Sequence, residues 1–214
     1  MKTYTLFIIF ALVSLFSFGQ GDSAFFIDEY RISVNETNLH DNNTNDGIGF
    51  GLGVYHSFST DKNASIIIGL EYNRTVQEKR VMFEEPNAYS TNVNYYINSL
   101  SVPLSVRYCF GKKSKAFIEA GPYFDFNFSS TKKGTMRLFN EDGVEILNYN
   151  FYDKVEIENF NYGISFGVGL IIPVSKYLLI IKPEYKFGVV SLYDFGDQIF
   201  NKYFRIVLCG KRKF

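Results

Sequence analysis

Apolar side chains alternate with small or polar ones through most of the 214-residue chain. In residues 47–58 glycine takes most of the odd positions, whereas the even ones carry Ile48, Phe50, Leu52, Val54 and Phe58. A period of two is typical of a strand with one apolar face. The pattern recurs in seven other segments, which are 25–35, 65–77, 98–111, 115–129, 160–173, 177–193 and 202–214. The sequence therefore predicts an all-β fold of eight antiparallel strands.

Short and long connections alternate between these segments. The short ones read as tight turns and are 59–63, 111–114 and 173–176. The long ones are 36–46, 78–94, 130–159 and 194–201. This regularity predicts an up-and-down barrel with short turns at one end and long loops at the other. Within the longest connection, an Asp142-Gly143 step predicts a hairpin that carries the flanking strands beyond the barrel.

The direction of the apolar face separates a membrane barrel from a soluble eight-stranded cup. If that face pointed inward, its Phe-rich and Ile-rich side chains would have to fit one narrow tube while glycine stripes faced water. We therefore expect the apolar face to meet lipid and the polar face to line the lumen, as in an outer-membrane barrel with short periplasmic turns and long extracellular loops. The strands also match the ~9 to 11 residues that cross a bilayer.

A lipid-facing apolar surface leaves ten charged side chains for the lumen by parity. The predicted lumenal charge network consists of Glu29, Arg31, Glu71, Arg107, Glu119, Asp125, Lys182, Glu184, Lys186 and Arg205. Five acids and five bases can pair with one another, whereas an uncompensated buried charge costs several kcal/mol. The whole chain is balanced as well, with 22 basic and 22 acidic residues. This balance gives no attraction to nucleic acid, so we expect no such partner.

The first residues have the composition of a secretory signal peptide. Lys2 precedes an apolar run over 6–16, and small residues follow at Ser17 and Gly19. The run is shorter than the ~20 residues of a membrane-spanning helix. We therefore expect a signal peptide over 1–19, a barrel domain over 20–214, and export to the outer membrane of a Gram-negative bacterium.

Four stretches carry a family resemblance. They are Gly-Phe-Gly-Leu-Gly-Val-Tyr at 49–55, Leu-Ser-Val-Pro-Leu-Ser-Val-Arg-Tyr-Cys-Phe-Gly at 100–111, Ala-Gly-Pro-Tyr at 120–123 and Gly-Ile-Ser-Phe-Gly-Val-Gly-Leu at 163–170. Together they resemble the PorT-like outer-membrane β-barrel family of Bacteroidota, a porin-type outer membrane protein beta-barrel domain. The resemblance covers nearly the whole mature chain and implies an outer-membrane barrel. Because the family joins a secretion-pathway component with many small barrels of unknown role, it implies no particular activity.

The last strand resembles the signal that the barrel-assembly machinery reads. The residues of this assembly signal share the lipid-facing parity and are Phe204, Ile206, Leu208 and Phe214. The resemblance implies contact with that machinery during biogenesis. Arg212 shares the same parity, where an outward cation at the interface costs only about 0–1 kcal/mol.

No pattern in the sequence points to catalysis, a cofactor or a metal. Catalysis needs a nucleophile or base in a defined partnership, but His40 falls in a loop and His56 on the lipid-facing parity. The Gly49-x-Gly51-x-Gly53 run continues a strand instead of opening a helix, which argues against a phosphate-binding loop. The acids of the long loops show no recurring ligand spacing. We therefore expect no enzyme, no cofactor and no metal site.

Glycine and cysteine positions give two further expectations for the lumen. Glycines in the segments 47–58 and 160–173 would leave room for the long cations Arg107, Lys182, Lys186 and Arg205. Cys109 and Cys209 are lumenal by parity but lie on opposite strands of a ring roughly 15 Å across. Because a disulfide needs Cα atoms within ~7 Å, we expect two free thiols.

These observations favour a small structural or interaction protein with a filled polar lumen and long extracellular loops that contact a partner. Two alternatives stay open. One is a narrow porin for small solutes, which the glycine stripes suggest and the ten lumenal charges oppose; the other is a PorT-like accessory of a secretion assembly. The expected partners are outer-membrane lipid, the barrel-assembly machinery during biogenesis, and a protein at the extracellular loops.

Overall fold

The computed structural model describes residues 27–37, 44–83, 89–111, 114–140, 142–191 and 200–212. These residues form nine strands, which are β1 (Glu29–Thr37), β2 (Thr44–Ser59), β3 (Ala64–Phe83), β4 (Tyr89–Phe110), β5 (Lys115–Phe139), β6 (Glu145–Lys154), β7 (Phe160–Val174), β8 (Tyr177–Ser191) and β9 (Phe200–Arg212). None of the described residues belongs to a helix long and apolar enough to span a membrane. The expected signal peptide over 1–19, His40 and Phe214 lie outside the described residues.

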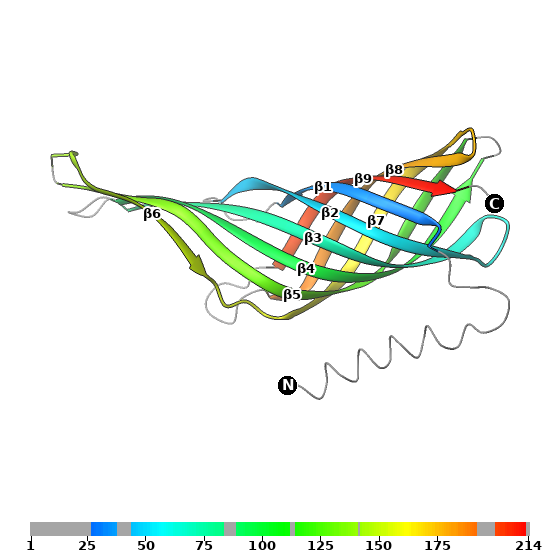
Figure 1. Ribbon diagram of the computed structural model, residues 1–214, viewed down its shortest axis with the longest axis horizontal. Coiled ribbons are helices and arrows are strands. Elements are labelled where there is room, and N and C mark those ends of the chain that lie inside the picture. Colours follow the sequence, from blue (N-terminus) through cyan, green and yellow to red (C-terminus); the bar gives the residue numbers. More distant parts are fainter. Residues whose placement is uncertain are drawn as a thin grey trace, which may run out of the picture.

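Eight of the strands close into a ring, with the order β1-β2-β3-β4-β5-β7-β8-β9. Every neighbouring pair is antiparallel, and β1 closes the ring against β9, where Val34 pairs with Ile206. Strongly tilted strands wrap around a common axis in Figure 1. The predicted eight-stranded up-and-down barrel is therefore confirmed.

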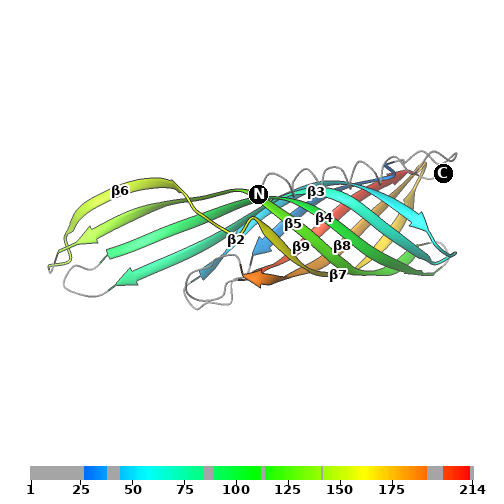
Figure 2. The same ribbon diagram turned by 90° about the horizontal axis from the view of Figure 1, so that it is seen from below.

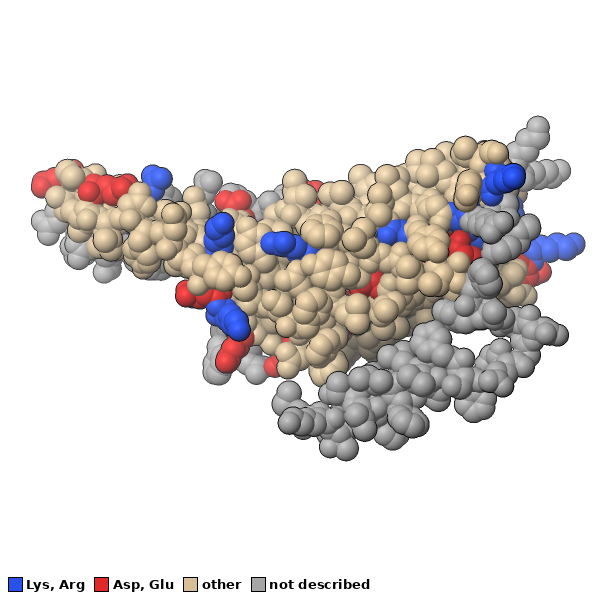
Figure 3. Space-filling model, in the orientation of Figure 1, with Lys and Arg blue, Asp and Glu red and all other residues tan. Residues whose placement is uncertain are grey.

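The two faces of the wall differ as the alternation predicts. Burial alternates without a break along β1, and along β7 it does so from Phe160 to Val168. Ile32 and Phe166 point outward and are more than half exposed, whereas Arg31 is 4% exposed. On the face shown in Figure 3, uncharged atoms cover most of the barrel surface. The apolar face is thus outside and the polar face lines the lumen.

Short turns gather at one end of the barrel. Two residues, Ser175 and Lys176, join β7 to β8, and Ser175 adopts a φ of 50°. Gly111 follows β4 with a φ of 100°, a conformation that favours glycine. Residues 60–63 join β2 to β3. The three predicted short turns are therefore confirmed.

At the other end, β3, β4 and β5 continue well past the ring, with lengths of 20, 22 and 25 residues. β6 lies outside the ring and pairs only with this outer part of β5, from Thr131 to Phe139. We call residues 76–83, 89–97, 130–139 and 145–154 the projecting sheet; it extends far to one side of the barrel in Figures 1 and 2.

The predicted Asp142-Gly143 hairpin forms the tip of the projecting sheet. Gly143 has a φ of 75°, and its N–H donates to the carbonyl of Asn140 at 3.0 Å. The sequence placed 78–94 in a loop, and this was wrong, because β3 and β4 leave only residues 84–88 between them. This stretch belongs to the projecting sheet, beyond the ring. Lipid and lumen therefore do not impose on it the apolar alternation that marks the other strands.

Candidate functional site in the barrel lumen

All ten side chains of the sequence-derived charge set point into the barrel. They come from six strands of the ring, and each is at most 4% exposed. The pleat explains this placement, because each of them shares the parity opposite to the apolar outer face. The lumen is therefore lined by charge rather than left open by small residues alone.

One part of the charge set is a four-residue cluster. Arg31 on β1 reaches Glu29 on its own strand at 2.6 Å and Glu119 on β5 at 3.0 Å. Arg107 on β4 binds the same two carboxylates, at 3.0 Å to Glu29 and 2.7 Å to Glu119. Two guanidinium groups thus share two carboxylates, and β1 is tied to strands on the far side of the ring.

A second group continues the network through β8 and β9. Lys182 lies 2.7 Å from Glu119 and also contacts Glu184. Arg205 binds Glu184 at 2.5 Å and pairs with Glu71 on β3. Glu71 also lies 3.5 Å from the ammonium group of Lys186, and it accepts a hydrogen bond from the Tyr55 hydroxyl.

Nine charges therefore form one connected network that crosses the lumen in several directions. Removing one partner of a buried pair leaves an uncompensated charge and costs about 3–5 kcal/mol. Because the contacts join opposite strands, a continuous water column through this level would have to break ion pairs. The arrangement can therefore brace the barrel by joining opposite strands across the lumen.

Asp125 is the tenth member and stands apart from the other nine. It is 1% exposed, and both of its carboxylate oxygens lack a hydrogen-bond partner among the described residues. Its backbone pairs with Ser101 on β4 and Asn161 on β7. The lumen beyond the ion-pair network holds further buried amide and hydroxyl groups, so it is polar but less completely paired.

An apolar layer lies in the lumen near the short turns. Phe117, Ile180, Val207 and Cys209 form a buried cluster, and Cys109 and Ile171 pack against it. Both cysteines are free, as expected. This layer was not predicted from the sequence, although Phe117 shares the parity of Glu119, and Val207 shares that of Arg205. The parity of these positions in their strands was the sequence signal that indicated it.

The glycines of these two segments make room for the neighbouring strands and for aromatic rings, which corrects the expectation that they serve the long cations. A Cβ at Gly47 would meet the Val76 carbonyl, one at Gly53 would lie 2.7 Å from the Tyr55 ring, and one at Gly169 would lie 2.5 Å from Phe117. Only Gly167 of the glycines in these segments fits the expectation, because its Cβ would meet the Lys182 side chain at 3.0 Å. Aromatic rings fill the lumen and also pack under the cations, as where Arg31 lies 3.7 Å from the centre of the Tyr55 ring.

The sequence motifs outside the lumen lie apart from it. Asp28, at the short-turn end, accepts hydrogen bonds from Ser57 and Lys211, each at 2.7 Å, and His56 lies 4.0 Å away. The Ser57 hydroxyl donates to the Asp28 carboxylate and accepts a hydrogen bond from Lys211. Phe204, Ile206 and Leu208 of the expected assembly signal point outward and are at least 42% exposed. No group of three or more potential metal ligands occurs among the described residues.

The comparison with protein families decides the class of this barrel. The profile of the family described as "Outer membrane protein beta-barrel domain" matches residues 18–198. The chain belongs to this family. It is a small outer-membrane β-barrel protein, and its apolar outer face therefore meets lipid. No curated protein matches the sequence.

Solved outer-membrane barrels resemble the chain in overall architecture at low identity. The Neisserial surface protein A is 12% identical with a TM-score of 0.48, and the match covers 87% of this chain and 95% of that one. The attachment invasion locus protein Ail of Yersinia pestis is 15% identical with a TM-score of 0.38, over 88% and 100% of the two chains. The outer membrane enzyme PagL is 12% identical with a TM-score of 0.33, over 86% and 99%.

Proposed function

We propose that this outer-membrane protein is a non-enzymatic interaction protein that binds a protein partner through the projecting sheet. The observation that carries the proposal is the edge strand β6. It pairs with β5 on one side only, and nearly all of its residues are exposed. Its sequence and the preceding turn present apolar side chains to solvent, namely Val144, Ile146, Leu147, Tyr149 and Tyr152.

An open strand edge with exposed apolar residues is costly unless another chain covers it. Native proteins usually protect such edges with short strands, charges or bulges. β6 has ten residues, and its charged groups sit at its ends, where Glu145 faces Arg137 and Asp153 faces Lys132 across the β5–β6 pair. The middle of the strand is left for a partner segment that would extend the sheet by main-chain hydrogen bonds.

The lumen supports a filled barrel over the alternative of a narrow porin. The charge network and the apolar layer occupy the interior at two successive levels. A barrel whose opposite strands are joined by lumenal ion pairs gives the projecting sheet a rigid base in the membrane. The PorT-like motifs are also compatible with an accessory protein of a secretion assembly. In that case the partner of the projecting sheet is a component of the assembly.

The test is capture of the partner from intact cells. A photo-crosslinking residue in place of Asn148 should trap a defined protein in the wild-type background. Ile146→Lys combined with Tyr152→Lys should reduce that crosslink by at least about tenfold, since charges on an edge strand oppose strand addition.

Val174→Lys combined with Tyr177→Lys is a matched control. These two apolar residues are also exposed, but they flank the short turn at the other end of the barrel. The control should leave the crosslink unchanged. An undiminished crosslink in the β6 variant, or no crosslink to any protein, would contradict the proposal.

A further inference from the structure

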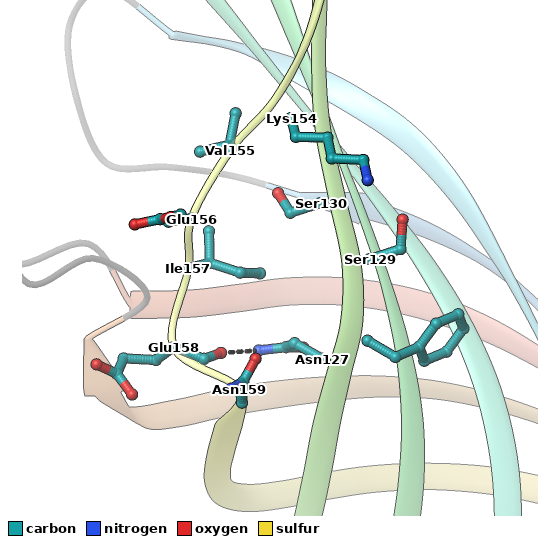
Figure 4. Close-up of a pocket in the computed structure, with 10 residues that line it drawn as sticks. Asn127, Ser129, Ser130, Lys154, Val155, Glu156, Ile157, Glu158 and Asn159 are labelled. Atoms are coloured by element: carbon teal, nitrogen blue, oxygen red, sulfur yellow. Dashed lines mark hydrogen bonds between the residues drawn. The ribbon is translucent and has the colours of Figure 1, made fainter.

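A pocket of about 740 Å³ lies where the ladder beside β5 is interrupted. β5 pairs with β7 as far as Phe126 and resumes pairing with β6 at Thr131. Between these points, the Asn127 N–H donates to the Asn159 carbonyl at 2.7 Å, and the Val155 N–H donates to the Ser130 carbonyl at 3.1 Å. The segment between Val155 and Asn159 bows away from β5 and leaves the pocket (Figure 4).

The wall of the pocket holds buried polar groups that lack partners. The Asn127 amide donates to the Glu158 carbonyl at 2.8 Å, but its Oδ1 has no partner among the described residues. The Ser130 hydroxyl likewise has none. Asn127 is 2% exposed and Ser130 8% exposed. Buried polar groups are normally hydrogen-bonded, so these two are suited to a ligand that offers hydroxyl groups.

The rest of the lining is amphipathic. Lys154 turns its ammonium toward β5, whereas the carboxylates of Glu156 and Glu158 point away from the pocket (Figure 4). Lys154 forms no ion pair with a described residue. Val155, Ile157 and Phe128 add apolar surface. A ligand that fits would combine an anionic group, hydroxyl groups and an apolar part.

Exposed aromatic residues lie beside the pocket. Phe126 and Phe160, the last pair of the β5–β7 ladder, are exposed aromatic residues with ring centres 5.3 Å apart. Phe128 beside them is 54% exposed. Exposed aromatic residues form girdles at membrane interfaces, and this end of the barrel carries the connections that we expect to face the cell exterior. The opening therefore meets the head groups of the outer leaflet.

We infer that this pocket binds the head group of an outer-leaflet lipid that carries a phosphate and hydroxyl groups. Lys154 donates to the phosphate, while Ser130 and the Asn127 carbonyl oxygen bond the hydroxyls. Ile157 and Phe128 contact the first carbons of the acyl chains. Only Lys154, the last residue of β6, is shared with the proposed partner-binding strand, so the site does not depend on the proposed protein partner.

The test is titration of the purified barrel, in a neutral detergent, with dioctanoyl phosphatidylglycerol followed by native mass spectrometry. This lipid carries a phosphate and two hydroxyls in its head group. Lys154→Ala should weaken its binding about tenfold and Ser130→Ala about threefold, the size expected for one charged and one neutral hydrogen bond. Lys132→Ala removes an exposed lysine of β5 that already pairs with Asp153, and it should leave the affinity unchanged.

Two further probes distinguish binding of a lipid head group from binding of a phosphate alone or of a free glycerol phosphate. Dioctanoyl phosphatidylcholine keeps the phosphate but lacks the hydroxyls, and it should bind several-fold more weakly. Glycerol 1-phosphate should compete only at far higher concentration. Equal losses in the Lys154 and Lys132 variants, no loss in either, or glycerol phosphate binding as tightly as the lipid would overturn the inference.

Discussion

The ring and the projecting sheet are built from the same strands but solve different problems. Within the ring, β3 to β5 have one face against lipid and one toward the lumen, and along β5 burial alternates sharply. Beyond the ring, the same strands lack both surroundings, and the alternation fades. The alternation of apolar and polar residues therefore marks the membrane-embedded length of a strand rather than the whole strand.

The largest loss of stability is expected from a substitution of Glu119, the carboxylate with the most ion-pair partners. Glu119 binds Arg31, Arg107 and Lys182. Glu119→Gln leaves three buried cations short of a partner, so the free energy of unfolding should fall by about 3–5 kcal/mol. Urea unfolding in lipid vesicles, followed by the gel mobility of folded and unfolded protein, measures the loss. A change below about 1 kcal/mol would show that the network is solvated rather than bracing.

Overpacking the lumen should have the next largest effect. Gly69→Ala places a methyl group against the Tyr55 ring, whereas Gly210→Ala meets nothing within 4 Å. The first should cost about 1–3 kcal/mol and the second far less, in the same unfolding assay. Equal stability of the two variants would mean that the ring of Tyr55 moves freely in the lumen.

Asp125→Asn separates the connected network from the rest of the lumen. Because Asp125 has no ion pair among the described residues, removing its charge should change the unfolding free energy by only about 1 kcal/mol or less, or increase it. A loss as large as that of Glu119→Gln would place Asp125 inside the network and redraw its boundary.

The smallest effect is expected in the projecting sheet. Lys132 and Asp153 form an ion pair at 3.6 Å whose side chains are 38% and 56% exposed. Lys132→Ala should lower the unfolding free energy by less than about 1 kcal/mol, and high salt should not change the difference between variant and wild type greatly. A loss approaching that of the lumenal variants would remove the contrast between the two regions.

Much of the ring could be predicted from sequence because lipid and lumen impose opposite chemistry on alternating residues. The eight strands, the short turns and the inward parity of residues such as Arg205 followed from that rule. The pairing within the lumen could not, because which carboxylate meets Arg205 depends on strand stagger and tilt. The aromatic filling was missed for a related reason, since Phe117 and Tyr123 look like lipid-facing residues until their parity is counted.

The pocket beside β5 was beyond sequence reasoning altogether. The residues from Val155 to Asn159 show no motif, and they form a cavity only because β6 and β7 pair with the same strand on either side of them. The hairpin at Asp142-Gly143 was predictable because its turn chemistry is local. How far it carries the sheet beyond the ring was not, because length is set by pairing with β4.

Single-channel recording in planar bilayers tests the filled lumen most directly. The wild-type protein should give no stable openings at either polarity. A variant with Arg31, Arg107, Glu29 and Glu119 all replaced by serine, combined with Phe117→Ala, removes the cross-lumen cluster, keeps its charge balance and thins the apolar layer, and it should admit ions. Stable openings of the wild-type protein would contradict the account, because they would require a continuous water path through the ion-pair network.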